Sequence, residues 1–268
     1  MPAMTEILHT PNREQVVTTN GWAFLHSLRV TQQVELADWT ALQRWSANDP
    51  AAFAAAVTEF ASLTVSPLRL TRHAGPQEAL VLRSCHATRL TLTRQECLAP
   101  GTRLPSDVAT LLARAWPREA LIGPLAELLL HTDVRPDDRL LVSGAAWPWL
   151  AALLEGATII LDQAGDLLGS AEEERATILV APAHLVASAA HLRPGRRHQL
   201  AGLRTIVATG GPLSPEGRRR VFTWEKSDVM LLARSGNTFW GNPLEPVLAQ
   251  PTGTPTFLTP PAVTPAPR

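Results

Sequence analysis

Cysteine is scarce in this chain, because Cys85 and Cys97 are the only two among 268 residues. They are too few for a disulfide framework and lack the spacing of metal ligands, so a reducing compartment fits best. No stretch reaches about 18 uninterrupted apolar residues, the length that a membrane-spanning helix needs, and the first residues are polar. We therefore expect no membrane span, no secretion signal and a cytoplasmic location.

A net charge is also missing, because 24 basic and 24 acidic residues balance to zero. This balance argues against a protein that neutralises nucleic-acid phosphates with a basic surface, so we expect no nucleic-acid partner. Tyrosine is absent and Lys226 is the only lysine, so arginine carries nearly all of the positive charge. The content of 45% hydrophobic and 18% charged residues is that of an ordinary globular domain with a sizeable core.

A pair of helices is predicted between about residues 30 and 62, while residues 1–30 give no firm assignment. Asp49 before Pro50 is typical of a helix cap followed by a first-turn proline. The second helix should therefore run from near Pro50 to near Ser62. The apolar residues that recur at helical intervals are Trp39, Leu42, Trp45, Phe53, Val57 and Phe60.

Strands alternate with helices from about residue 135 to 235, which predicts right-handed crossovers and a mostly parallel sheet covered on both faces. The fold class that we expect is α/β, with a parallel-rich sheet flanked by helices. The predicted strands are 139–142, 157–161, 177–181, 204–208 and 228–232, and the predicted helices are 107–114, 119–131, 147–154, one opening at Pro182 and one at Pro215.

Two further runs, 79–82 and 89–93, predict a β-hairpin in which Ser84 to His86 form the connection. At the other end, prolines and threonines dominate from Pro243 onward, and such a stretch cannot form a packed element of its own. We therefore predict one domain over residues 1–248 and a disordered tail over 249–268.

The stretch from Arg204 to Pro215 joins a β-branched run, a glycine turn and a helix start. Parallel sheets bind ligands at the carboxyl ends of their strands, so this stretch is a candidate ligand site. A second turn begins at Ser235 and is expected to complete the pocket. The candidate residues are Thr209, Gly210, Gly211, Pro212, Ser235, Gly236, Asn237 and Thr238.

Several short blocks occur in one order along the chain: residues 39–60, 135–142, 147–149, 154–161, 203–216 and 235–243. Together they resemble acetyl- and acetoacetyl-CoA synthetases of the adenylate-forming (AMP-binding) acyl-CoA ligase superfamily. The resemblance implies that the eight candidate residues are a remnant of a nucleotide site. It also implies AMP or ATP as the nucleotide, an adenylate or acyl compound as the ligand, and Trp147 in an acyl pocket.

The chain departs from that family at the groups that act on ATP. Residues 106–130 contain no glycine-rich loop to offer N–H groups to a triphosphate. Phe239 stands where the family has an acidic residue that helps to hold magnesium, and a phenyl ring cannot coordinate this cation. Lys226 matches no catalytic position, and the ribose-binding aspartate and lysine-bearing domain of the family have no counterpart in these blocks.

Loss of one preorganised charge-stabilising group costs on the order of a hundred- to a thousandfold in rate, so we expect a degenerate relative without ATP-dependent ligation, catalytic residues or metal. It would bind a ligand, regulate, or act in a complex with a protein partner. Two alternatives stay open: an acyl-CoA ligase completed by a partner chain, and a protein-interaction module.

Other motifs have a plainer interpretation. Ser235 lacks the Gly-x-Ser-x-Gly context of a hydrolase nucleophile. Only two of the regularly spaced histidines, His184 and His191, fit on one helix, which is weak support for a metal site. We expect the arginines of 193–197 to lie in a solvated loop and those of 218–220 to form the exposed face of a helix.

Overall fold

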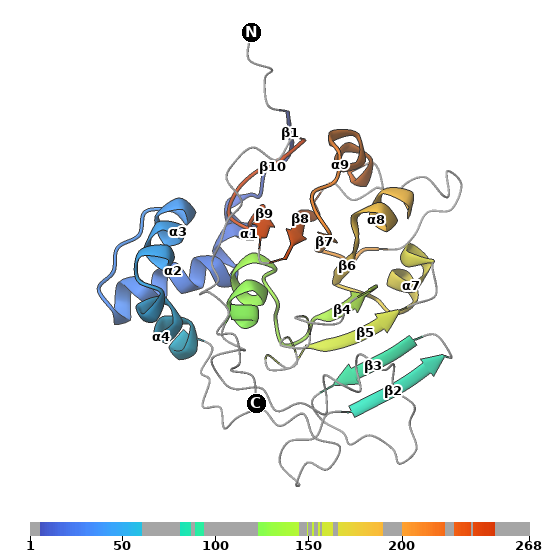
Figure 1. Cartoon of the computed structure of the whole chain (residues 1–268), viewed down its shortest axis with the longest axis horizontal. Coiled ribbons are helices and arrows are strands. Elements are labelled where there is room, and N and C mark those ends of the chain that lie inside the picture. Colours follow the sequence, from blue (N-terminus) through green and yellow to red (C-terminus); the bar gives the residue numbers. More distant parts are fainter. Residues whose placement is uncertain are drawn as a thin grey trace, which may run out of the picture.

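A mixed β-sheet forms the centre of the computed structural model (Figure 1). Within the part of the chain that the structure describes, this sheet has eight strands in the order β2-β3-β5-β4-β6-β7-β8-β9. The described residues are 6–60, 81–86, 89–93, 123–144, 149, 152, 155, 157–162, 166–189, 200–222, 228–236 and 238–249. The strands are β2 (Val81–His86), β3 (Arg89–Thr93), β4 (Arg139–Val142), β5 (Thr158–Asp162), β6 (Ile178–Pro182), β7 (Thr205–Thr209), β8 (Met230–Ser235) and β9 (Thr238–Trp240).

The strands at the centre of the sheet run parallel. β4 lies between β5 and β6, β6 pairs with β7, and β7 pairs with β8. The pairs β2–β3, β3–β5 and β8–β9 are antiparallel. The expected α/β fold with a parallel-rich sheet is confirmed, and each of the five predicted central strands is present within a few residues of its expected bounds.

The predicted hairpin of β2 and β3 is confirmed, but its connection is shorter than expected. Ser84 pairs with Leu90 and His86 pairs with Arg89, so the residues assigned to the connection belong to β2. Strand pairing uses backbone groups alone, and polar side chains therefore do not end a strand whose neighbour continues.

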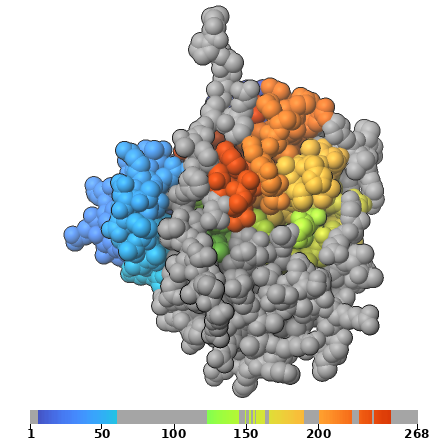
Figure 2. All heavy atoms as spheres, in the orientation of Figure 1, coloured from blue at the N-terminus to red at the C-terminus, as the bar shows by residue number. Residues whose placement is uncertain are grey.

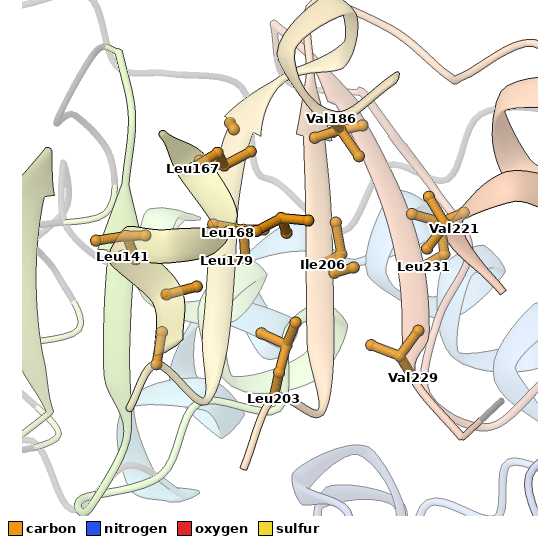
Figure 3. Close-up of a cluster of buried hydrophobic side chains, with 14 of the residues drawn as sticks. Leu141, Leu167, Leu168, Leu179, Val186, Leu203, Ile206, Val221, Val229 and Leu231 are labelled. Carbon is orange, nitrogen blue, oxygen red and sulfur yellow. The ribbon is translucent and has the colours of Figure 1, made fainter. Parts of the chain in front are cut away.

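Three helices cover one face of the sheet: α7 (Leu167–Glu173), α8 (Ala183–Ala189) and α9 (Pro215–Val221). Figure 3 shows Leu168, Val186 and Val221 pointing toward Leu179, Ile206 and Leu231 of the strands, and these side chains belong to one buried cluster. Because side chains alternate along a strand, the buried Leu140, Val180 and Leu232 face the opposite side.

The opposite face is covered by helical residues 123–126 and the π-helical turn η1 (Glu127–His131) that continues them (Figure 1, green). Next to this turn lie α2 (Asn20–Thr31), α3 (Trp39–Asn48) and α4 (Pro50–Phe60), the blue helices. The predicted helical pair is α3 and α4, whereas α2 was not predicted. The side chains of Asp38 and Asp49 accept hydrogen bonds from the N–H groups of Ala41 and Ala52, as expected for helix caps.

The two ends of the described chain meet in a small second sheet. β1 (Ile7–His9) pairs antiparallel with β10 (Val247–Leu248), and α1 (Arg13–Val17) follows β1 behind a capping box of Asn12 and Gln15. β10 obtains its hydrogen bonds from β1 and Val247 is buried, so the proline- and threonine-rich stretch after Pro243 packs up to residue 249 by pairing with a distant segment.

Other predictions fall outside the described residues: the tail after residue 249, the helix at 107–114 and most of 147–154. Among the described residues, no helix is long and apolar enough to cross a membrane.

Candidate functional site

The carboxyl edge of the central strands carries the candidate turns. β4 lies between β5 and β6 in the sheet. The connection after β4 leads to β5 on one side of it, and the connection after β6 leads to β7 on the other side, so the two connections run in opposite directions from β4. Open α/β sheets bind ligands at such a switch point, outside the carboxyl ends of the strands. Gly144 follows β4 there with a φ of 106°, and a Cβ built on it would lie 3.8 Å from the ring of Pro182 at the end of β6.

The structure brings the two predicted turns together at this edge. Thr209, the last residue of β7, pairs with Arg234 of β8, so Gly210 and Gly211 emerge beside Ser235 and Gly236. Ser235 in turn pairs with Thr238, which makes the second turn a tight hairpin. Seven of the eight predicted residues thus lie on adjacent strand ends, while Asn237 and the predicted acyl residue Trp147 lie outside the described residues.

The glycines of both turns adopt backbone conformations that other residues avoid. Gly210 has a φ of 86°, Gly211 of 135° and Gly236 of 58°. A Cβ built on any of them would meet no described atom within 4 Å, so conformation and not crowding selects glycine here. Gly210, Ser235 and Gly236 are exposed, so among the described residues nothing covers the turns at this edge.

A partly buried ion pair lies beneath the turns, in which Glu127 is buried and Arg234 is 16% exposed. Arg234 donates from Nε and Nη2 to Oε2 of Glu127, at 3.3 and 3.2 Å. Its guanidinium carbon lies 5.8 Å from the ring centroid of Trp149 and 5.6 Å from that of Phe239. Two aromatic rings and a carboxylate therefore hold this arginine in place.

His131 connects this region to the N-terminal helices. Its ring stacks on Phe239 at 4.6 Å and meets Trp39 edge-on at 5.1 Å. Nδ1 lies 3.4 Å from the carbonyl oxygen of Gly241, and Nε2 has no partner among the described residues. Burial lowers the pKa of His131 to about 4, against the opposing effect of the Gly241 carbonyl.

This histidine predicts a loss of stability in acid. The unfolded chain binds a proton at His131 below pH 6.5, its ordinary pKa, and the folded chain does so only near pH 4. The free energy of unfolding therefore decreases as the pH falls from 6.5 to 4, by about 3 kcal/mol at most. Urea titrations at several pH values should show this contribution in the wild-type chain and not in a His131→Phe variant.

Carboxylates also titrate in this range, so the relevant quantity is the difference between the two proteins at each pH. Equal pH dependence of the wild type and His131→Phe would contradict the prediction. The exposed His26 offers a matched control, since His26→Phe makes the same substitution without removing the buried ring of His131.

Arg204, at the start of the candidate stretch, does not face the turns. It precedes β7 at the amino edge of the sheet, where it pairs with Asp133 and Asp138. Arg135 also donates to Asp133, at 2.7 Å, and Thr177 donates to Asp138, at 2.7 Å. This network joins the strand starts and belongs to the structural framework.

A cavity of about 230 Å³ opens at the same amino edge. Its walls include Arg135, Arg204 and Asp133, together with residues of β1, α1 and the 242–247 segment. Both arginines are already paired with carboxylates, Arg135 with Asp133 and Arg204 with Asp133 and Asp138. The cavity therefore lies at the other end of the strands from the predicted turns.

One predicted surface feature is wrong. On α9, Arg219 is exposed and Arg220 is half-buried, but Arg218 is only 3% exposed, and its Nε donates to the carbonyl oxygen of Leu248 at 2.7 Å. Burial lowers the pKa of Arg218 to about 10. The sequence could not show this, because β10 covers that side of the helix and β10 itself was not predicted.

Among the described residues, no group of three histidine, cysteine or acidic side chains is arranged to hold a metal ion. Sequence reasoning missed Gly144, Glu127, His131 and Arg234. Gly144 had a signal, since glycine just after a strand marks a turn. The others depend on contacts between distant parts of the chain.

The fold and half of the sequence have recognisable counterparts, although no protein-family model matches the chain. The chain is homologous to the acetoacetyl-coenzyme A synthetase of Rhizobium meliloti (strain 1021), with 33% identity over 147 residues, 47% of this chain and 23% of that protein. It is 32% identical to the acetoacetyl-CoA synthetase of Xenopus tropicalis over 132 residues, 44% of this chain and 20% of that protein. The matched region thus spans less than a quarter of these curated relatives.

The solved structure of acetoacetyl-CoA synthetase from Streptomyces lividans superposes with a TM-score of 0.63 at 16% identity, covering 90% of this chain and 67% of that chain. This likeness shows the shared fold.

Proposed function

We propose that this homologue of acetoacetyl-CoA synthetases binds an adenylate or acyl ligand at the carboxyl edge of its sheet and does not carry out ATP-dependent ligation. It would then act as a ligand-binding or regulatory protein, alone or in a complex. The observation that carries the proposal is that two parts of one hairpin differ in exposure. A Cβ built on Gly236, in the turn after Ser235, meets no described atom within 4 Å, which leaves room for a ligand. Phe239, three residues after Gly236, is 1% exposed and stacked on His131.

Two further features support a site that holds a ligand without acting on ATP. Phe239 stands where the related enzymes have an acidic residue for magnesium, and a buried phenyl ring gives a cation no oxygen ligand. The sequence of residues 106–130 has no glycine-rich loop to offer N–H groups to a triphosphate. Its described part, residues 123–130, is helical and packs toward Arg234 through Glu127.

Calorimetric titration with AMP, ATP and CoA tests the proposal. AMP should bind to the wild type, and Gly210→Ala should weaken this binding at least about tenfold, or about 1.4 kcal/mol, because a φ of 86° strains any residue with a Cβ. Gly202→Ala is the matched control, since Gly202 lies in an exposed turn at the amino edge with room for a Cβ.

The absence of ligation needs its own assay, in which the protein is incubated with ATP, magnesium, CoA and a panel of short acids. No AMP should form. AMP formation that disappears in Ser235→Ala or Thr238→Val would overturn the proposal, because those residues would then serve catalysis.

A second candidate is an active acyl-CoA ligase whose remaining parts come from a partner chain. The matched region covers 23% of the Rhizobium meliloti relative, so most of that enzyme has no aligned counterpart here. Ligation that appears only after a separate lysine-bearing domain is added would favour this candidate. A pull-down partner lost on deletion of residues 249–268 would instead favour an interaction module.

A further inference from the structure

Arg234 is a charged side chain in the layer next to the proposed ligand turns. Arg234 pairs with Thr209 of β7 on one side and with Phe239 of β9 on the other. The glycine turn begins directly after Thr209, and the hairpin turn lies between Arg234 and Phe239. Because Leu232, two residues earlier, is buried on the η1 face, Arg234 projects from the same face, which its contact with Glu127 confirms.

The contacts of Arg234 leave part of its guanidinium unused. Both hydrogen bonds to Glu127 come from Nε and Nη2, and Nη1 donates to no described residue. Among the described residues, Nη1 is not a buried atom that lacks a partner, so it is accessible at the surface. The Arg234 side chain is 16% exposed, whereas that of Glu127 is 3% exposed. A guanidinium has five donors, so one edge can bind Glu127 while the other remains open to a ligand.

The surroundings fix this open edge before any ligand arrives. The rings of Trp149 and Phe239 lie within 6 Å of the guanidinium carbon, and Trp149 is 2% exposed. An arginine held by a carboxylate and two rings loses little conformational entropy when it binds an anion. The planar fork also matches the two oxygens that a carboxylate or a phosphate presents.

We propose that Arg234 is the anion-binding residue of this site and that its free edge binds the phosphate or carboxylate group of the ligand. The proposal rests on the proposed function, which it deepens by naming the group that recognises the ligand's charge. The group that Arg234 would bind is a small anion that presents two oxygens. Two ligands carry such a group: AMP has a phosphate, and a short acid such as acetoacetate has a carboxylate.

Three probes separate these sources in calorimetric titrations: AMP, adenosine and acetoacetate. Adenosine has the base and ribose of AMP without its charge, so its binding should not depend on Arg234. In a Glu127→Gln/Arg234→Gln variant, AMP or acetoacetate should bind about 10- to 100-fold more weakly, the loss expected for a hydrogen bond to a charged group. Loss for AMP alone assigns the phosphate, and loss for acetoacetate alone assigns the carboxylate.

The double variant is used because Arg234→Gln alone would leave Glu127 buried without its cation, which endangers folding. Arg29→Gln is the matched control, because Arg29 is exposed on α2 and pairs with the exposed Glu35, so this variant should bind each probe as tightly as the wild type. Thermal melts verify that each variant is folded. Equal anion affinity in the wild type and the double variant would overturn the role of Arg234 while leaving the proposed function intact. Failure of the wild type to bind any probe would overturn both.

Discussion

Trp39→Ala should lower the free energy of unfolding by about 3–5 kcal/mol, the usual cost of removing a large buried aromatic side chain. Trp39 is 2% exposed, lies in one buried cluster with Phe24 and Phe53, and meets His131 edge-on at 5.1 Å. Its loss opens a cavity between the N-terminal helices and η1, the turn that also carries Glu127. Urea denaturation followed by circular dichroism measures the change.

Trp22 provides the matched control, because it lies on α2 with 46% of its surface exposed. Trp22→Ala deletes the same atoms without leaving a cavity and should change the free energy of unfolding by less than about 1 kcal/mol. Similar losses for both variants would show that the helices do not pack against η1 as described. Trp39→Phe should cost less than Trp39→Ala, since it also removes an indole N–H that has no partner among the described residues.

Arg204→Met should destabilise the chain by about 3 kcal/mol, the lower end of the cost of breaking a buried ion pair. Asp133 and Asp138 are 2% and 5% exposed, so the substitution leaves two buried carboxylates with one cation fewer. Arg135 still pairs with Asp133, which is why the lower value applies. Asp133 is additionally held at a φ of 55°, an uncommon conformation that its surroundings must maintain.

The control for this prediction is Arg29→Met. Arg29 pairs with Glu35 at 3.3 Å, but both side chains are more than two thirds exposed, so the denaturation midpoint should not change. Arg204→Lys should fall between the two, because lysine cannot contact both carboxylates with a planar fork. If Arg204→Met denatures at the same urea concentration as Arg29→Met, the network contributes nothing to stability.

Local sequence signals predicted the elements of the central sheet well. Runs such as residues 205–208 are rich in β-branched and apolar side chains, because strands buried on both faces need such side chains. Ser214 before Pro215 fixed the start of α9, where the hydroxyl accepts a hydrogen bond from the N–H of Gly217. The two glycine turns were predicted in the same way, since a strand that ends in glycine must turn.

Prediction failed where an element owes its stability to a distant partner. β1 and β10 contain three and two residues, too few for a periodic pattern, and each forms only because the other supplies its hydrogen bonds. Arg218 is a related case. The residues around it in the sequence are the same whether its side chain is exposed or covered by β10, so the local sequence does not distinguish the two environments. α2 lacked a clear signal since exposed Trp22 and Val30 interrupt its apolar stripe.

The sequence alone determined the α/β fold, the helix caps and the two turns of the candidate site, because spacing, propensity and backbone conformation are properties of neighbouring residues. Only the tertiary structure decided what lies beneath those turns. Glu127 and Arg234 are 107 positions apart, and His131 meets Gly241 across 110. No local pattern encodes such pairs, since they exist only once η1 packs on the sheet and buries Glu127 and His131.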